Sequence, residues 1–435
     1  METIKIPVVE KKYRVPFIII TSLFALWGFA NDITNPMVAA FKTVMEIPNA
    51  EAALIQFAFY GGYATMAIPA ALFVQKYSYK KGILLGLALY AIGALMFWPA
   101  AKYEVFGYFL ISLYILTFGL AFLETTANPF ILSLGHPKTA TRRLNLAQSF
   151  NPVGSLMGMF VASQIVLPQL LSDRRDEAGN LIFPTLDAAE KATIRAHDLM
   201  VIRDPYVALG IVVIIMFVVI LMTHMPDTGH AKSIHPMQSF RRLAKNKIFR
   251  EGVIAQIFYV AAQIMCWTFI IQYADNLGID KATAQRYNIL AMVIFLSSRF
   301  ISTAMMKYVN PRLLLMVFAI GGMITTSLAI TIEGMFGLYS LIATSAFMSL
   351  MFPTIYGIAL RDVGEDATLG AALLVMAIVG GALMPPLQGA IIDLGRVAWL
   401  PAVNASFVLP FISFVFIAIF GYRANQHDKI LQGAK

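Results

Sequence analysis

Residues 205–224 read PYVALGIVVIIMFVVILMTH and contain no Asp, Glu, Lys or Arg. A helix of about 20 mainly apolar residues crosses the hydrocarbon core of a bilayer, so this stretch predicts a membrane span. The whole 435-residue chain is similar in character, with 59% hydrophobic and 13% charged residues. Water-soluble proteins contain about 45–50% apolar and about 25% charged residues. The composition indicates an integral membrane protein and excludes a soluble enzyme, a disordered protein and a fibrous repeat.

Eleven further stretches have the length and apolar character of a span. The twelve predicted spans cover residues 16–41, 51–74, 82–101, 105–134, 143–171, 205–224, 251–274, 284–307, 312–332, 335–360, 367–391 and 397–422. The joins are short, except for a mixed-charge loop at 172–204 and a basic linker at 225–250. The linker separates an N-terminal half, residues 1–224, from a C-terminal half, residues 251–435. We therefore predict an all-α membrane protein with twelve transmembrane helices in two six-helix halves.

The basic residues are distributed unevenly across the predicted membrane. Of the 33 Lys and Arg residues, 22 lie on the same side as the N-terminus and 10 on the other side. Cytoplasmic loops are rich in Lys and Arg, so we expect both termini in the cytoplasm. The scatter over many loops argues against a nucleic-acid partner, despite a net charge of +9. The first basic residues, which include Lys11 and Arg14, lead directly into a span without a small-residue cleavage pattern, so no signal peptide is expected.

The cysteine and histidine residues of this chain indicate neither a disulfide nor a metal site. Cys266 is the single cysteine, so no intramolecular disulfide is expected. The six histidines lie in or beside polar segments, and no pair has the spacing of metal ligands on a helix. The spans also contain no nucleophile with an accompanying base. We predict no metal site, no cofactor and no enzymatic activity.

Away from the ends of the predicted spans, the charged residues are Asp32, Glu124 and Arg299. A charge at the bilayer centre costs about 2.5–3.5 kcal/mol on insertion scales, so such a residue faces the protein interior or water. Burial favours the neutral form of a carboxylic acid, and a proton-coupled carrier needs a carboxylate that takes up and releases a proton. We predict Glu124 and Asp32 as proton-coupling residues, with helix packing as the alternative. Arg299 is expected to pair with a carboxylate or with helix-end carbonyls.

Neutral polar side chains recur at helical spacing within the same spans. They are Asn31 and Asn35; Asn128, one turn after Glu124; Asn145, Gln148 and Asn151; and Gln256, Tyr259, Gln263 and Trp267. Residues three or four positions apart share a helix face. Amides carry both donors and acceptors, which suits sugar hydroxyls. We interpret the set as the lining of a polar cavity, and the alternative is hydrogen bonding between helices.

The two halves resemble each other weakly. A basic loop follows the second span (Lys76 to Gly82) and the eighth span (Lys307 to Arg312), and the fourth and tenth spans carry Pro129 and Pro353 at similar depth. Gly-rich runs in the fifth and eleventh spans, including Gly154 and Gly158, allow close helix packing. This arrangement resembles the plan of the major facilitators, in which the substrate site lies between the two halves.

Five strings resemble one branch of the major facilitators, the fucose:proton symporter family. They are LWGFAND at 26–32, ETTANPF at 124–130, RLNLAQSFN at 143–151, MFPTIY at 351–356 and MAIVGGA at 376–382. The resemblance implies that Glu124 is the coupling and sugar-contacting glutamate. It also implies that Asn128, Gln148 and Asn151 line the cavity, and Tyr356 joins them as a candidate sugar ligand.

One departure from the family concerns the first span. The usual family string is Asn-Asn-Leu-Asn-Asp, whose acid would fall at Asn35, whereas this chain has Asp32 three residues earlier. Three residues are nearly one helical turn, about 4.5 Å along the same face. Asp32 could therefore substitute for the usual acid, with its proton site displaced along the cavity.

The resemblance implies a secondary active transporter in a bacterial cytoplasmic membrane that carries L-fucose with a proton by alternating access. Other family members carry glucose, galactose or N-acetylglucosamine, and some use sodium, so these alternatives stay open. A non-transporting sugar sensor usually carries an added soluble domain, and only thirteen residues follow Tyr422 here. The expected partners are a sugar, a proton and the lipid bilayer, and we expect a monomer.

Overall fold

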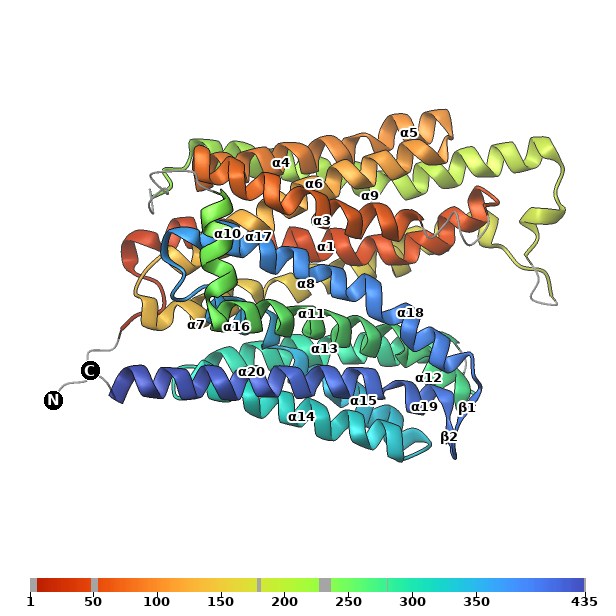
Figure 1. Ribbon diagram of the computed structural model, residues 1–435. Helices are drawn as coiled ribbons and strands as arrows, with labels where there is room; N and C mark the ends of the chain where they lie inside the picture. Colours follow the sequence, from red (N-terminus) through yellow and green to blue (C-terminus); the bar gives the residue numbers. More distant parts are fainter. Residues whose placement is uncertain (1–5, 48–53, 178–180, 227–235, 280, 434–435) are drawn as a thin grey trace. The chain divides into compact units, whose positions relative to one another are not determined.

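The computed structural model describes residues 6–47, 54–177, 181–226, 236–279 and 281–433 of the chain (Figure 1). Side chains at 35–39, 42, 56–57, 281–282 and 431–433 are not among those described. Residues 227–235 of the predicted linker lie outside these ranges. The described chain is almost entirely helical, as its composition predicts.

The chain forms two compact units, each described here by itself. Unit 1 comprises residues 1–17, 128–149 and 228–435, and unit 2 comprises residues 18–127 and 150–227. The segment 128–149 thus groups with residues that follow the predicted linker. The division of the sequence into halves at 225–250 stays a prediction.

Unit 2 is built from long helices and a few short turns. From Ile18 onward its elements are α1 (Arg14–Val44), α3 (Leu54–Lys76), α4 (Tyr79–Leu95), α5 (Phe97–Tyr103), α6 (Phe106–Ser133) up to Ala127, α8 (Asn151–Phe160), the π-helix Val161–Val166, the 3-10 turns Leu167–Gln169, Leu171–Asp173 and Phe183–Thr185, and α9 (Ala188–Met222).

Unit 1 has a short hairpin in addition to its helices. Its elements are the 3-10 turns Lys11–Tyr13 and Pro137–Thr139, α7 (Ala140–Gln148), α10 (Pro236–Lys245), α11 (Lys247–Thr268), α12 (Ile270–Asn276), α13 (Lys281–Met305), α14 (Pro311–Thr331), α15 (Met335–Met348), α16 (Met351–Ala359), the 3-10 turn Gly364–Asp366, α17 (Ala367–Met376), the 3-10 turn Ala377–Val379, α18 (Gly380–Ile392), β1 (Arg396–Val397), β2 (Leu400–Pro401), α19 (Ala402–Ser406) and α20 (Val408–Gly433).

Eleven helical stretches among the described residues are long and apolar enough to cross a membrane. The remaining predicted span corresponds to α3, which has 23 residues. Two predicted boundaries are wrong. The span predicted at 397–422 begins at Ala402, because residues 396–401 form an antiparallel hairpin. The predicted loop at 172–204 is helical from Ala188, because the Asp187 side chain accepts a hydrogen bond from the Glu190 N–H at 2.8 Å and caps α9.

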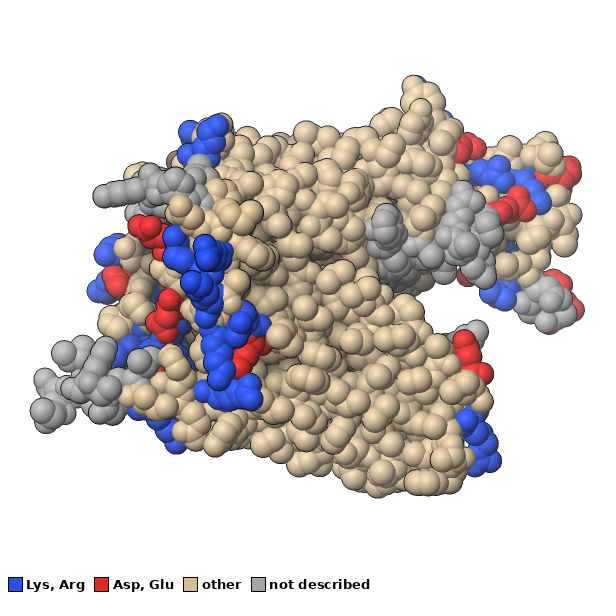
Figure 2. Space-filling model, in the orientation of Figure 1, with Lys and Arg blue, Asp and Glu red and all other residues tan. Residues whose placement is uncertain are grey.

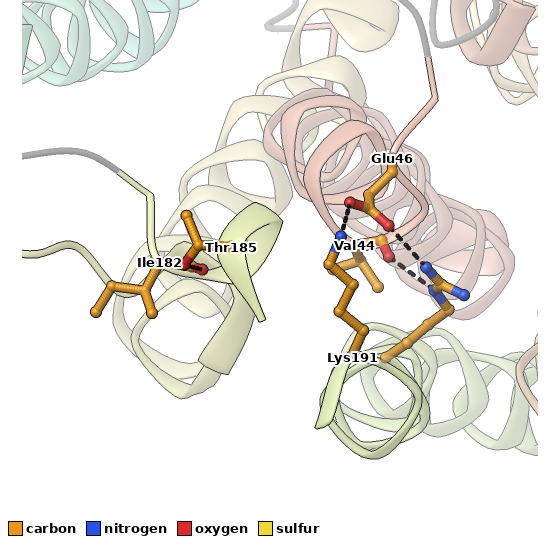
Figure 3. Close-up of polar contacts among 6 residues, drawn as sticks. Val44, Glu46, Ile182, Thr185 and Lys191 are labelled. Carbon is orange, nitrogen blue, oxygen red and sulfur yellow. Dashed lines mark hydrogen bonds and ion pairs between the residues drawn. The ribbon is translucent and has the colours of Figure 1, made fainter. Parts of the chain in front are cut away.

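The N-terminal turns of α9 contact the C-terminal end of α1 through side-chain hydrogen bonds. Lys191 donates to the Glu46 carboxylate at 2.7 Å (Figure 3). Arg195 donates to the same carboxylate at 3.2 Å and to the Val44 carbonyl at 3.0 Å. The residues are about 145 positions apart in sequence, so no local pattern could have indicated this contact. Because these contacts hold the first turns of α9 in place, the helix continues beyond the apolar stretch.

Inside unit 2, α1 and α8 approach at glycines. A Cβ atom at position 154 would overlap the Ala25 carbonyl oxygen, and one at position 28 would overlap the Asn151 carbonyl oxygen. The backbones are therefore in direct contact. Lipid supplies no hydrophobic force between helices, so such close packing is a main source of their association.

The Gly154 contact predicts a stability change. Gly154→Ala should lower the free energy of unfolding by about 1–3 kcal/mol, the usual cost of overpacking. The measurement is the thermal unfolding midpoint of purified protein in detergent. The control is Gly107→Ala in α6, where a Cβ would meet nothing within 4 Å, so its midpoint should stay the same or rise. Equal midpoints for both variants would contradict the close approach.

Candidate functional site

Two polar clusters contain the candidate site residues, one in each unit. Unit 2 holds Asn31, Asp32, Asn35, Glu124 and Asn151, and the side chain of Asn35 lies outside those described. Unit 1 holds the other candidates, which are Asn128, Asn145, Gln148, Gln256, Tyr259, Gln263, Arg299 and Tyr356.

The unit 2 cluster contains both carboxylates. Asp32 on α1 is half-buried, and Ser155 of α8 and Tyr60 of α3 are near enough to influence its carboxylate or to be influenced by it. Glu124 on α6 is half-buried, and its charge is felt by Tyr63 of α3. Each carboxylate therefore has hydroxyl groups of a neighbouring helix in its surroundings. Sequence reasoning missed these partners, because Ser155, Tyr60 and Tyr63 lie outside the quoted strings.

The two amides of this cluster differ in how they are satisfied. The Asn151 amide donates to the Phe24 carbonyl at 3.2 Å and so ties α8 to α1. The Asn31 side-chain oxygen is buried and has no hydrogen-bond partner among the described residues. Asn151 therefore has a packing contact, whereas Asn31 retains a free acceptor.

The unit 1 cluster includes three amides on or beside α7. Gln148 donates to the Asn128 side-chain oxygen at 2.9 Å. Asn145 donates to the Thr354 hydroxyl of α16 at 3.1 Å, which joins α7 to α16. All three amides are almost fully buried. Their bonds match the interhelical role that the sequence left open as an alternative to cavity lining. Thr354 was missed, although it lies inside the quoted string at 351–356.

The other unit 1 candidates lie on α11 and α16. Gln256 and Tyr259 are fully buried, and Gln263 is half-buried. Neither polar atom of the Gln256 amide has a hydrogen-bond partner among the described residues. The rings of Tyr259 and Tyr356 both lie about 6 Å from that of Phe352, with centroid distances of 6.1 Å and 6.2 Å. Gln256 is thus the amide with the most unused hydrogen-bonding capacity in this cluster.

Arg299 on α13 is buried at 3% exposure and donates hydrogen bonds to two backbone carbonyls. Its Nε donates to the Ser349 carbonyl, and its Nη1 donates to the Gln148 carbonyl at 3.1 Å. The guanidinium also lies over the Phe295 ring at 4.5 Å and interacts with Tyr259. Of the two partners expected from the sequence, helix-end carbonyls are therefore the ones observed.

Both carbonyls are freed by prolines. Proline has no N–H, so it cannot bond to the carbonyl four residues earlier, and helices break there. Pro152 stands four residues after Gln148, and Pro353 stands four residues after Ser349. The breaks fall at equivalent positions, between α7 and α8 and between α15 and α16. A single guanidinium thus donates hydrogen bonds to the free carbonyls at two proline breaks. Within a membrane, such carbonyls need donors from neighbouring parts of the protein, because no water is available.

The comparisons with known proteins agree with this architecture. A family model described as Major Facilitator Superfamily matches residues 18–377. The chain belongs to the major facilitator superfamily. Its fold is accordingly the twelve-helix, two-half arrangement of that superfamily, which confirms the fold class predicted from the sequence.

Three relatives cover nearly the whole chain. The L-fucose-proton symporter of Haemophilus influenzae is 68% identical over 96% of this chain and 98% of its own length. The L-fucose-proton symporter of Escherichia coli is 33% identical over 96% of this chain and 94% of its own length. The crystal structure of the transporter FucP in the outward conformation is 31% identical, with a TM-score of 0.87, covering 95% of this chain and 99% of that one.

The hydrogen bonds of Arg299 predict that a conservative substitution at this position lowers the stability of the protein. Arg299→Lys keeps the charge, but one ammonium group cannot reach two carbonyls in the fixed directions of a guanidinium. Stability should fall by about 1–3 kcal/mol, the cost of leaving a buried acceptor unsatisfied. Differential scanning calorimetry of the sugar-free protein in detergent measures this change.

The matched control is Arg286→Lys, an exposed arginine on the same helix, which should leave the transition unchanged. Adding Pro353→Ala to Arg299→Lys should recover part of the loss, because it restores an N–H for the Ser349 carbonyl. If Arg299→Lys unfolds at the parent temperature, the two carbonyls do not depend on the guanidinium.

Proposed function

We propose that this chain is a secondary active transporter that carries L-fucose together with protons by alternating access. The observation that carries the proposal is the 68% identity, over almost the full length, to a protein named L-fucose-proton symporter. The half-buried carboxylates of Asp32 and Glu124, set in otherwise apolar helices, supply the chemistry that such a function needs. Transport of another hexose and sodium coupling are the alternatives.

In the proposed cycle, Glu124 takes up a proton from the outside and L-fucose binds between the halves. The carrier then changes from an outward-open to an inward-open state, and sugar and proton are released inside. Asp32 acts as the second carboxylate and replaces the usual first-span acid from one turn earlier. Its half-buried position on α1 supports this role.

The sugar ligands in this proposal follow from unused hydrogen-bonding capacity. Asn31 and Gln256 have buried polar atoms without partners among the described residues, so they are the amides that gain most from a sugar hydroxyl. Tyr259 and Tyr356 supply aromatic surface for the apolar face of a sugar ring. Asn128, Asn145, Gln148 and Asn151 already have partners, so they would act on the sugar only after exchanging those bonds.

The proposed setting is the cytoplasmic membrane of a bacterium, with both termini inside and one chain as the working unit. The excess of Lys and Arg on the side of the termini supports this orientation. The basic linker then lies at the cytoplasmic surface.

Replacing the proposed coupling residue separates proton-driven transport from sugar exchange. Glu124→Gln keeps the shape and hydrogen-bonding groups but cannot release a proton. In proteoliposomes with an inward proton gradient, accumulation of radiolabelled L-fucose should fall at least tenfold, whereas exchange of internal for external L-fucose should persist. Asp32→Asn is assayed in parallel.

The same assay also tests sodium coupling and transport of another hexose, and it includes a control variant. A sodium gradient without a proton gradient should drive no accumulation in the parent, and excess glucose or galactose should compete poorly. Ser163→Ala, at a hydroxyl outside both clusters, serves as the control and should transport like the parent. Full proton-driven accumulation by Glu124→Gln would remove this residue from the coupling mechanism.

Gln256 predicts opposite effects on stability and on binding. Gln256→Met replaces a buried amide without partners by an apolar side chain of similar size. The sugar-free protein should become more stable by about 1–3 kcal/mol, because the desolvation penalty disappears. L-fucose binding, measured by calorimetry on purified protein, should weaken about tenfold or more.

Gln388→Met is the matched contrast. The Gln388 amide is also fully buried, and its oxygen likewise has no partner among the described residues, but its nitrogen donates to the Ser406 hydroxyl at 3.0 Å. Gln388→Met should therefore stabilise the protein less than Gln256→Met does and leave L-fucose affinity unchanged. Unchanged L-fucose affinity in Gln256→Met would make Gln256 a packing residue.

A further inference from the structure

Helix α10, residues Pro236–Lys245, has two distinct faces that are not charged. One is buried, and the other is apolar and exposed. Ser239 and Leu243 are buried against unit 1. Met237 and Phe240 are 79% and 52% exposed, and Ala244 is exposed on the same face. Residues three, four and seven positions apart share a helix face, so these three form one continuous stripe. This exposed stripe lies beside the buried face formed by Ser239 and Leu243, and no described part of the chain packs over it.

The adjacent face of α10 is basic. Arg241 and Lys245 lie one turn apart and are exposed, and Arg242, Lys247 and Arg250 continue the positive charge. Residues 236–250 contain no Asp or Glu. Figure 2 shows Lys and Arg side chains gathered over α10. The helix therefore combines an exposed apolar stripe with a basic stripe in which Arg241 and Lys245 have no ion-pair partner among the described residues, the pattern of helices that lie in a membrane interface.

The position of α10 in unit 1 suits such a role. Only Asn246 separates it from α11, a membrane-spanning helix, and the Asn246 side chain accepts from the Phe249 N–H at 3.1 Å to cap α11. Figure 1 shows α10 lying across the direction of α11 and α20 rather than along it. An element that crosses the end of the spans lies in the plane of the membrane surface.

We infer that α10 docks on anionic phospholipid headgroups of the cytoplasmic leaflet, with Met237 and Phe240 inserted among the acyl chains. The inference rests on the cytoplasmic orientation proposed above. Charge complementarity selects anionic lipid: each Lys or Arg near an anionic surface contributes about 1 kcal/mol. An acidic protein would match the basic stripe, but it would leave the exposed apolar stripe in water.

An ion pair links this surface to the transport helices. Arg242 donates to both carboxylate oxygens of Asp366, at 2.8 Å and 2.6 Å. Asp366 stands directly before α17, which together with α18 forms one membrane-spanning stretch. A lipid contact would therefore hold α10 in place, and the bidentate ion pair between Arg242 and Asp366 connects α10 to the start of α17.

The test uses the full chain in vesicles and a fluorophore on α10. Met237→Cys provides an accessible thiol for labelling, since the native Cys266 is buried. The vesicles contain phosphatidylcholine with brominated acyl chains, which quench on contact, and increasing fractions of phosphatidylglycerol. We expect quenching that increases with phosphatidylglycerol. In the Met237→Cys background, Arg241→Gln with Lys245→Gln should weaken the docking equilibrium about fivefold for each charge removed, which moves the quenching curve to higher phosphatidylglycerol fractions.

The matched control removes two exposed arginines of another segment, with Arg174→Gln and Arg175→Gln, and should leave the quenching curve unchanged. No quenching in any vesicle would place Met237 in water and overturn the inference, which is also the outcome expected for an acidic protein partner. Quenching independent of phosphatidylglycerol and of Arg241 and Lys245 would equally overturn it. L-fucose exchange in the same vesicles reports transport separately, so failure of the inference is distinct from failure of the proposed function.

Discussion

The hydrocarbon core of a membrane offers no hydrogen bond to a backbone carbonyl, so each carbonyl freed by a proline needs a partner inside the protein. Pro152 and Pro353 free the carbonyls of Gln148 and Ser349, and the Arg299 guanidinium binds both. The fork of an arginine supplies donors in several directions at once, which a lysine does not. The breaks in two membrane helices therefore depend on one buried side chain of a third helix.

The polar side chains of the spans also need hydrogen-bond partners inside the protein, and they differ in whether they have them. Asn145 with Thr354, and Gln148 with Asn128, satisfy one another across or within helices, so their burial costs little. Gln256 has no such partner, and a buried amide without one is costly. A carrier can tolerate that cost where a substrate hydroxyl later supplies the missing bond. The proposed sugar contacts at Asn31 and Gln256 follow from this reasoning.

The fold was largely predictable from the sequence, because a span needs only enough apolar length. The beginning of α9 was missed, although Asp187 with Glu190 three residues later is a local signal for a helix start. The contact of this helix with Glu46, some 145 residues away, could not be predicted from the sequence. Hydropathy also placed the twelfth span too early, because the hairpin at 396–401 is apolar enough to be read as helix. Within the site, the residue types were found, but their partners were not. Whether Arg299 binds a carboxylate or a carbonyl depends on three segments brought together by folding, although the proline spacing could have indicated carbonyls.

The two kinds of contact on the fifth predicted span differ in a way that fits alternating access. At α8 the contact with α1 is between backbones at Gly28 and Gly154, and neither helix can shift without a clash or a gap. At α7 the contacts with α13 and α16 include hydrogen bonds from side chains to a carbonyl and a hydroxyl. A water molecule or a sugar hydroxyl can replace the bond between Asn145 and Thr354 at small net cost, whereas the Gln148 carbonyl needs the Arg299 guanidinium. Exchange with a substrate hydroxyl is therefore easier at the Asn145 bond than at the carbonyls next to the proline breaks.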